Sequence, residues 1–126
     1  TVFQGRMFAS IGSCTSSVRD APAGIRGSVH SVQAGQCISY DKDLGSGWRH
    51  LAALRQGGEL RLYVNGQLVA KSAAFNSEDY DLTVKPPLKI GFGEHDSFTG
   101  RIREVRLHHR ALTDREIAAL HESSRP

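Results

Sequence analysis

Hydrophobic and polar residues alternate most regularly within Glu59–Ala73, which reads ELRLYV-NG-QLVAKSA. In the first half of this run, aliphatic residues at every second position alternate with Arg61 and Tyr63, the period of two that indicates a half-buried β-strand. Between the two halves, Asn65-Gly66 supplies the two positive φ angles of a type I′ turn. The pattern therefore predicts a β-hairpin whose aliphatic face is buried and whose Arg61 and Tyr63 face outward.

Weaker β-prone runs, separated by turn signals, cover much of the remaining chain. They are Thr1–Ile11, Gly27–Val32, Gln36–Tyr40, Trp48–Leu54, Leu88–Gly93 and Gly100–His109. In the last run, Ile102 has the opposite parity to Val105 and Leu107, which indicates either a β-bulge or a strand covered on both faces. Many short strands of this kind predict an all-β domain.

A short helix is expected at the end of the chain, from Asp114 to His121. Thr113 is a good N-cap, and Glu116 three residues later completes a capping box. Leu112 and Ile117 have the spacing of a hydrophobic staple. Because so short a helix is marginal alone, we expect its apolar side chains to hold it against the sheets.

The composition fits a single domain spanning residues 1–126. The chain has 16 Lys and Arg against 13 Asp and Glu, for a net charge of +3. This excess is modest and spread along the sequence, so no nucleic-acid partner is implied. No run of about 18 apolar residues is present, so no membrane span is expected.

Cys14 and Cys37 are the only cysteines. Two cysteines are too few for a typical zinc site, and we expect one disulfide between them. Closing this loop would stabilise the fold by roughly 3 kcal/mol through chain entropy. The alternative is two unpaired thiols in a reducing compartment.

A series of motifs from Trp48 onward points to a known family. In order, they are Trp48-x-His50-Leu-Ala, Leu60-Arg-Leu-Tyr-Val-Asn-Gly-Gln-Leu-Val-Ala, Leu88-Lys-Ile-Gly, Phe98-x-Gly-x-Ile-x-Glu-Val-Arg-Leu and Arg110-Ala-Leu-Thr-x-x-Glu-Ile. This ordered set resembles the C-terminal half of laminin G-like jelly-roll domains of the concanavalin A-like lectin and glucanase group. The resemblance covers Trp48 to about Leu120, while residues 1–47 match weakly, as in a shortened copy or a fragment.

The resemblance implies an antiparallel two-sheet β-sandwich, or jelly roll, with the short C-terminal helix. It also implies a secreted, periplasmic or cell-surface protein, often an accessory domain of a larger one, that binds glycans or proteins, in some members through calcium. Trp48 stands where the family usually packs a residue inward, and His50 is expected to be a structural hydrogen-bonding residue.

Candidate ligand-binding residues fall into two groups. Exposed aromatic rings stack on sugars, and the candidates are Tyr40, Tyr63 and Tyr80. Arginine forks pair with anionic oxygens, and Arg106, His108 and Arg110 share one parity on the Gly100–His109 strand and its extension. A glycan or anionic polysaccharide is the expected ligand, and a solvated sheet face is the alternative.

Calcium needs six to eight oxygen ligands, and the acidic segment around Asn76, Asp79 and Asp81 is the best source. A purely solvated acidic loop is the alternative. For catalysis, the nearest carboxylate pair is Glu94-x-Asp96, which lacks a third acid downstream, so we expect no enzyme. The sequence predicts a non-catalytic carbohydrate-binding module, with a structural or protein-interaction domain as the alternative and a glycosidase as a minor one.

Overall fold

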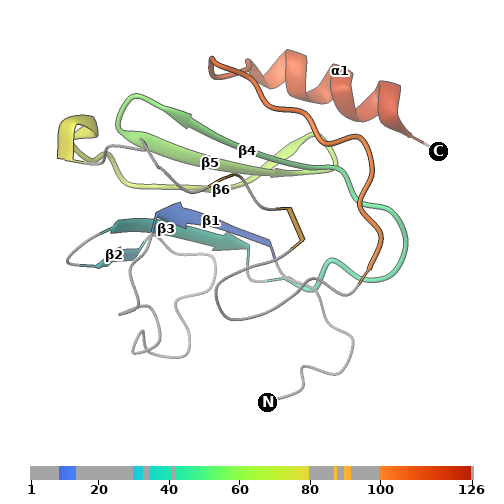
Figure 1. The fold of residues 1–126 in the computed structure, drawn as a ribbon, viewed down its shortest axis with the longest axis horizontal. Helices are drawn as coiled ribbons and strands as arrows, with labels where there is room; N and C mark the ends of the chain where they lie inside the picture. The colour runs from blue at the N-terminus through green and yellow to red at the C-terminus, as the bar shows by residue number, and fades with distance from the viewer. Residues whose placement is uncertain are drawn as a thin grey trace.

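A computed structural model describes residues 9–13, 30–32, 35–40, 42–79, 87, 90–91 and 100–125. The elements, in chain order, are β1 (Ala9–Ser13), β2 (His30–Val32), β3 (Gly35–Tyr40), β4 (Leu51–Gln56), β5 (Glu59–Val64), β6 (Gln67–Lys71), the 3-10 turn η2 (Ser77–Asp79) and α1 (Asp114–Ser124). The strands form two three-stranded antiparallel sheets, ordered β1-β3-β2 and β4-β5-β6. Figure 1 shows one sheet above the other, with α1 on the outer side of the β4-β5-β6 sheet.

The core lies where the sheets face each other, because β3 contacts both β5 and β6. Its buried side chains come from both sheets and from the loop after β3; they are Ile38, Leu44, Leu60, Leu62 and Ala70. Each aliphatic side chain of this size contributes about 1.5–3 kcal/mol when it is fully buried. The aliphatic face that the sequence predicted for β5 is therefore the face that holds the sheets together.

The predicted hairpin is confirmed. Asn65 and Gly66 join β5 to β6 with φ angles of 50° and 76°, as a type I′ turn requires. One feature was not expected: the pairing shifts register between Leu62, opposite Ala70, and Tyr63, opposite Leu68. This irregularity is a β-bulge, which increases the local twist of the strands.

Strand β4 begins three residues later than expected, at Leu51, so Trp48 and His50 precede the sheet. The turn residue Asn65 fixes this entry, because its N–H donates to the carbonyl of His50 at 2.8 Å and its Oδ1 accepts from the His50 N–H at 3.1 Å. These bonds come from the His50 backbone, and the predicted structural hydrogen bond of its side chain is not met at Nδ1, which has no partner among the described residues.

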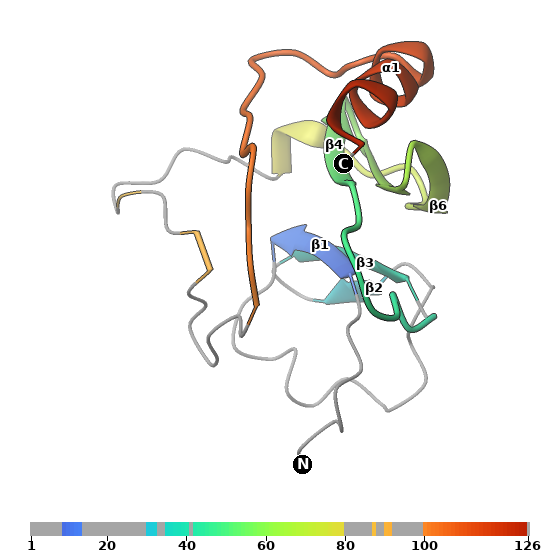
Figure 2. The same ribbon diagram turned by 90° about the vertical axis from the view of Figure 1, so that its right-hand side faces the viewer.

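The segment of residues 100–110 departs from the prediction, because no strand is assigned to it. In Figure 2 its described part runs straight past the two sheets to the start of α1. Glu104 has a φ of 54°, and this left-handed residue lies between Ile102 and Val105. A backbone irregularity at this point explains the change of parity. The apolar side chains are exposed, Leu107 by 75%, rather than packed.

The described residues thus confirm antiparallel β-sheets with a C-terminal helix, and α1 ends at Ser124, three residues beyond the prediction. Closure into a complete jelly roll stays a prediction. The strand expected over Leu88–Gly93 lies mostly outside the described residues. No helix in the described part of the chain is long and apolar enough to span a membrane.

The turn between β4 and β5 tests this packing. A Cβ at Gly58 would collide with the carbonyl oxygen of Phe75, whose N–H donates to the Gly58 carbonyl at 2.8 Å. Gly58→Ala should therefore lower the free energy of unfolding by about 1–3 kcal/mol, the usual cost of overpacking. Urea denaturation checks this beside Gly57→Ala, where nothing lies within 4 Å but the φ of 56° carries a strain of its own of about 1–2 kcal/mol. An unchanged stability of Gly58→Ala would contradict the described contact.

Candidate functional site

Helix α1 covers the hairpin face that was predicted to be exposed. Tyr63 is only 1% exposed, and its hydroxyl donates to Oδ1 of Asp114 at 2.6 Å. Ile117 of α1 is equally buried. Gly66 permits the close approach, because a Cβ there would lie 3.3 Å from the Cα of Ala118. The prediction that Tyr63 faces outward to stack on a sugar is therefore wrong, since the helix occupies that face.

A chain of opposite charges lies beside Tyr63. Glu59 accepts from Arg61 Nε at 2.5 Å and from Lys71 Nζ at 3.1 Å, and Arg61 lies 3.9 Å from Asp114. The Arg61 hydrogen bond is the main reason that the pKa of Glu59 is lowered. The pKa of Tyr63 is raised, first by burial and then by its hydrogen bond to Asp114. Charge on this side of the sheet is largely neutralised internally.

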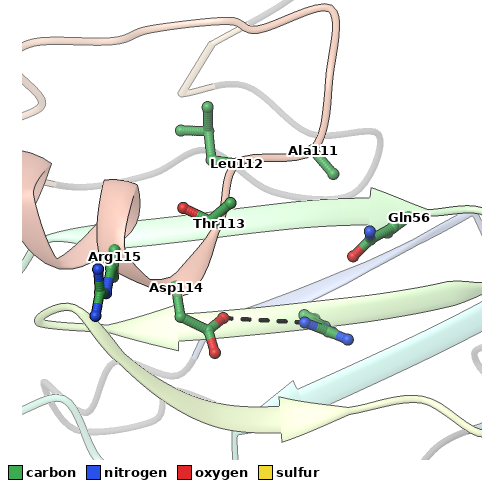
Figure 3. A pocket seen from close by; sticks show the side chains of 7 residues that line it. Gln56, Ala111, Leu112, Thr113, Asp114 and Arg115 are labelled. Atoms are coloured by element: carbon green, nitrogen blue, oxygen red, sulfur yellow. Dashed lines mark ion pairs between the residues drawn. The ribbon is translucent and has the colours of Figure 1, made fainter.

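An open depression of about 430 Å³ lies next to this network. Its lining comes from the end of β4, from β5 and from the start of α1: Gln56, Arg61, Ala111, Leu112, Thr113, Asp114 and Arg115. Figure 3 shows these side chains and the ion pair between Arg61 and Asp114. Because its central charges are paired with each other, the depression offers little to attract a charged ligand.

The start of α1 is held by an arginine that was predicted to bind ligand. The capping box is confirmed, with Thr113 Oγ1 accepting from the Glu116 N–H at 3.2 Å and Glu116 accepting from the Thr113 N–H at 2.8 Å. Both terminal nitrogens of Arg110 also donate to the Glu116 carboxylate, at 2.6 and 2.9 Å. These contacts lower the pKa of Glu116 to about 2. Arg110 therefore serves the helix cap.

At the other end of α1, a tryptophan and an arginine lie together on the surface. The guanidinium carbon of Arg103 lies 4.7 Å from the centre of the Trp48 ring, within cation–π range. Arg103 also donates to the carbonyl of Ser124 at 2.9 Å. Trp48 is 43% exposed, so the expectation that it packs inward is not met. It lies ahead of β4 rather than within the sheet, which explains its exposure.

Two histidines and a further arginine adjoin this pair. The rings of His50 and His121 are 5.6 Å apart between centroids. Nδ1 of His50 is buried and has no hydrogen-bond partner among the described residues. Burial, then the charges of His121 and Arg106, lowers the pKa of His50, while Glu104 opposes the shift. Arg106, 3.9 Å from Glu104, has a side chain that is 51% exposed.

We call the group of Trp48, His50, Arg103, Arg106 and His121 the Trp48 surface. It brings the loop before β4, the 100–110 segment and the end of α1 into electrostatic and ring contact. Sequence reasoning found only Arg106 of this group as a ligand-binding candidate. The other four residues come from segments that meet only in the folded chain, so no spacing in the sequence indicated that they lie together.

The other predicted binding residues are scattered. Tyr40 is partly buried and packs against the core cluster, so it is not an open stacking platform. His108 is exposed. Tyr80 lies outside the described residues, and its role stays a prediction.

The predicted calcium ligands are only partly described. Oδ1 of Asn76 accepts from the N–H of Glu78 at 3.2 Å, a local turn contact. Asp81 and the side chain of Asp79 lie outside the described residues. Within the described part of the chain, no three His, Cys, Asp or Glu side chains form a metal-binding group. Asn76 alone is too little to test the site, so calcium stays a prediction.

The predicted disulfide cannot be followed either, because Cys14 lies outside the described residues. Cys37 is in β3, where its backbone pairs with Gly12 and His30. The disulfide stays a prediction, as does the carboxylate pair Glu94-x-Asp96, which also lies outside the described residues.

Comparison with known proteins places this arrangement in a family. The model of the concanavalin A-like lectin/glucanases superfamily matches residues 13–118. The chain belongs to this superfamily. The laminin G-like resemblance of Trp48 to Leu120 is thereby confirmed, and the superfamily match begins well before it. The superfamily includes both lectins and glycosidases, so membership alone does not decide between binding and catalysis.

Among solved structures, this superfamily member is similar to an S-layer domain-containing protein (residues 221–444) from Clostridium thermocellum. The identity is 24% and the TM-score 0.45. The match covers 73% of this chain and 48% of that one, so the chain spans about half the length of its structural neighbour. No protein of curated function matches the sequence.

Replacing the buried hydroxyl tests how α1 is anchored. Tyr63→Phe removes a hydrogen bond to a carboxylate and should lower the free energy of unfolding by about 1.5–3 kcal/mol. A double-mutant cycle with Asp114→Asn, measured by urea denaturation, isolates the pair. Strictly additive single and double variants would show that the two side chains do not interact.

The helix cap predicts an acid dependence. The folded-state pKa of Glu116 is about 2, below its ordinary value of 4.5. The unfolded chain therefore takes up the proton first, so this contribution to stability is present above pH 4.5 and is lost as the pH falls toward 2. Glu116→Gln should flatten the fall in stability over that range. Thermal unfolding at pH 5 and pH 2.5 checks this, with Glu122→Gln as the control.

Proposed function

We propose that this domain is a non-catalytic recognition module that binds anionic polysaccharides through the Trp48 surface. The observation that carries the proposal is the exposed Trp48 ring with the Arg103 guanidinium at 4.7 Å from its centre. A partly exposed indole offers an apolar face to a sugar ring. A guanidinium beside it offers planar donors to a sulfate or carboxylate on the same sugar.

Arg103 is held in place before any ligand arrives. Its bond to the Ser124 carbonyl, at 2.9 Å, and its position at the Trp48 ring restrict its rotamers. Side chains ordered in advance lose less entropy on binding, so each contact contributes more to affinity. The bond to Ser124 uses one terminal nitrogen, which leaves the other donors of the guanidinium for a ligand.

The charge around Trp48 supports an anionic ligand over a neutral one. Between residues 101 and 110, Arg101, Arg103, Arg106, His108 and His109 are exposed, and Glu104 is the only acid. We exclude Arg110 from the proposed site, because Glu116 already neutralises it. The binding set is therefore Trp48, Arg103 and Arg106, with His108 as an outer contact.

Other features of the module are proposed from the family and the sequence. We infer a complete two-sheet jelly roll acting outside the cell, at the surface or in the periplasm, as an accessory domain of a larger protein. Absence of catalysis is inferred because Glu94-x-Asp96 has no third acid downstream. A calcium ion, if bound near Asn76, would support the loops, while the Trp48 surface would act through its own charges.

A second candidate, a protein-interaction domain, is favoured by the exposed apolar side chains of Ile90, Ile102, Val105 and Leu107. Contiguous exposed apolar patches often mark a protein interface, and three of these four side chains lie within residues 102–107. Binding of such a protein partner should depend neither on Trp48 nor on the salt concentration.

Variants of the Trp48 surface test the polysaccharide proposal. Arg103→Ala should weaken binding to heparin, used as a sulfated probe, by at least about tenfold, since one charge-assisted contact contributes about 1.5–3 kcal/mol. Trp48→Ala should weaken it as well, because it removes the apolar ring and the ring contact of Arg103. Arg115→Ala is the matched control, because Arg115 is an exposed arginine at the other end of α1. Isothermal titration at two salt concentrations, with and without a chelator, gives the affinities.

Binding should weaken at higher salt, and an uncharged glucan should not bind. Failure to bind heparin, or an Arg115→Ala loss equal to that of Arg103→Ala, would exclude the Trp48 surface as the site.

A further inference from the structure

The two ends of α1 are attached to the hairpin by different chemistry. At the start, Asp114 accepts from Tyr63, and Glu116 is held by Arg110. The pKa of Glu116 is about 2, so this carboxylate stays ionised in mild acid. The cap at the start of the helix should therefore stay intact well below pH 6.

Toward its other end, α1 contacts the residues before β4 through a pair of imidazole rings. His121 faces His50 at 5.6 Å between ring centroids, and a Cβ on Gly66 would lie 3.3 Å from the Cβ of His121. Because Asn65 binds the His50 backbone through its own N–H and through its side-chain Oδ1, His50 has little freedom to move away. Protonation of both rings would place two like charges in a tight contact.

The surroundings of His50 oppose its protonation. Its buried Nδ1 has no acceptor among the described residues that could stabilise an added proton. The ionisable groups that face it are His121 from α1, and Arg106 and Glu104 from the 100–110 segment. Two of these three disfavour a charge on His50, and Glu104 is itself 3.9 Å from Arg106. Burial, the largest cause, also lowers the pKa of His50.

We propose that the His50–His121 contact is an acid-sensitive latch that holds the C-terminal half of α1 on the hairpin and releases it in mild acid. The sign follows from linkage: His50 is harder to protonate when docked than when exposed. The released state therefore takes up protons preferentially. Docking is fully stable above the ordinary histidine pKa of about 6.5 and weakens as the pH falls below it.

Release of this half of α1 would also change the Trp48 surface. Arg103 donates to Ser124, the last residue of α1, so helix release removes one of the two contacts that place Arg103 at Trp48. Trp48 is the only tryptophan in the chain. Its fluorescence therefore reports on the latch directly, whether or not the surface binds a polysaccharide.

The test follows Trp48 emission from pH 8 to pH 5 in the intact chain, together with NMR hydrogen-exchange protection factors for Ala118–Ser124. In the unaltered protein, emission should change reversibly with a midpoint below pH 6.5, and protection in the C-terminal half of α1 should fall at least tenfold. Amides of β5 should keep their protection, because the sheet stays folded.

His121→Gln removes one of the two charges and should abolish the transition or move it at least one pH unit lower. His109→Gln, at an exposed position, should leave it unchanged. An NMR titration of the unaltered protein gives an independent readout that needs no variant: the pKa of His50 should lie below the ordinary histidine value of about 6.5. The latch is excluded if His121→Gln keeps the same midpoint, or if the pKa of His50 is at or above the ordinary histidine value of about 6.5.

Discussion

The docking of α1 across the outer face of the β5-β6 hairpin is the contact on which the candidate site depends. The helix covers the outer face of β5, which would otherwise be exposed to water. Both faces of β5 are therefore buried, with Leu62 against the other sheet and Tyr63 beneath the helix. The Tyr63 hydroxyl then needs a partner, because a buried unpaired hydroxyl is costly, and Asp114 supplies it. Gly66 suits this contact, because its φ is 76° and an added Cβ would lie only 3.3 Å from the Cα of Ala118.

The docking of α1 also fixes the position of Arg103 on the surface. The helix begins near β5 and ends near the start of β4, so its last carbonyl lies within reach of Arg103. That bond and the Trp48 ring place the guanidinium, and His121 brings a second imidazole to His50. A site of this kind is assembled by a helix end rather than by the sheets that define the superfamily. This is why the fold family alone leaves the ligand open.

The arginines beside the two ends of α1 differ in how they are paired. At the start of the helix, Arg61 is paired with Glu59, and Arg110 with Glu116, so these cations are neutralised by the carboxylates that hold the helix. At the end of the helix, Arg103 is held by a carbonyl and an aromatic ring, which position the cation without cancelling its charge. The second arrangement attracts an anion from solution more strongly than the first, because its charge is not already paired.

What the sequence alone determined were the features that depend on neighbours along the chain. The type I′ turn at Asn65-Gly66, the strand period of β5 and the capping box at Thr113 each need only a few consecutive residues. The motifs from Trp48 onward also carried the family. Only the tertiary structure decided that Tyr63 is buried, that Trp48 is exposed and that Arg103 joins it. A period of two shows which side chains share a face of a strand, but what covers that face is a contact between segments distant in sequence.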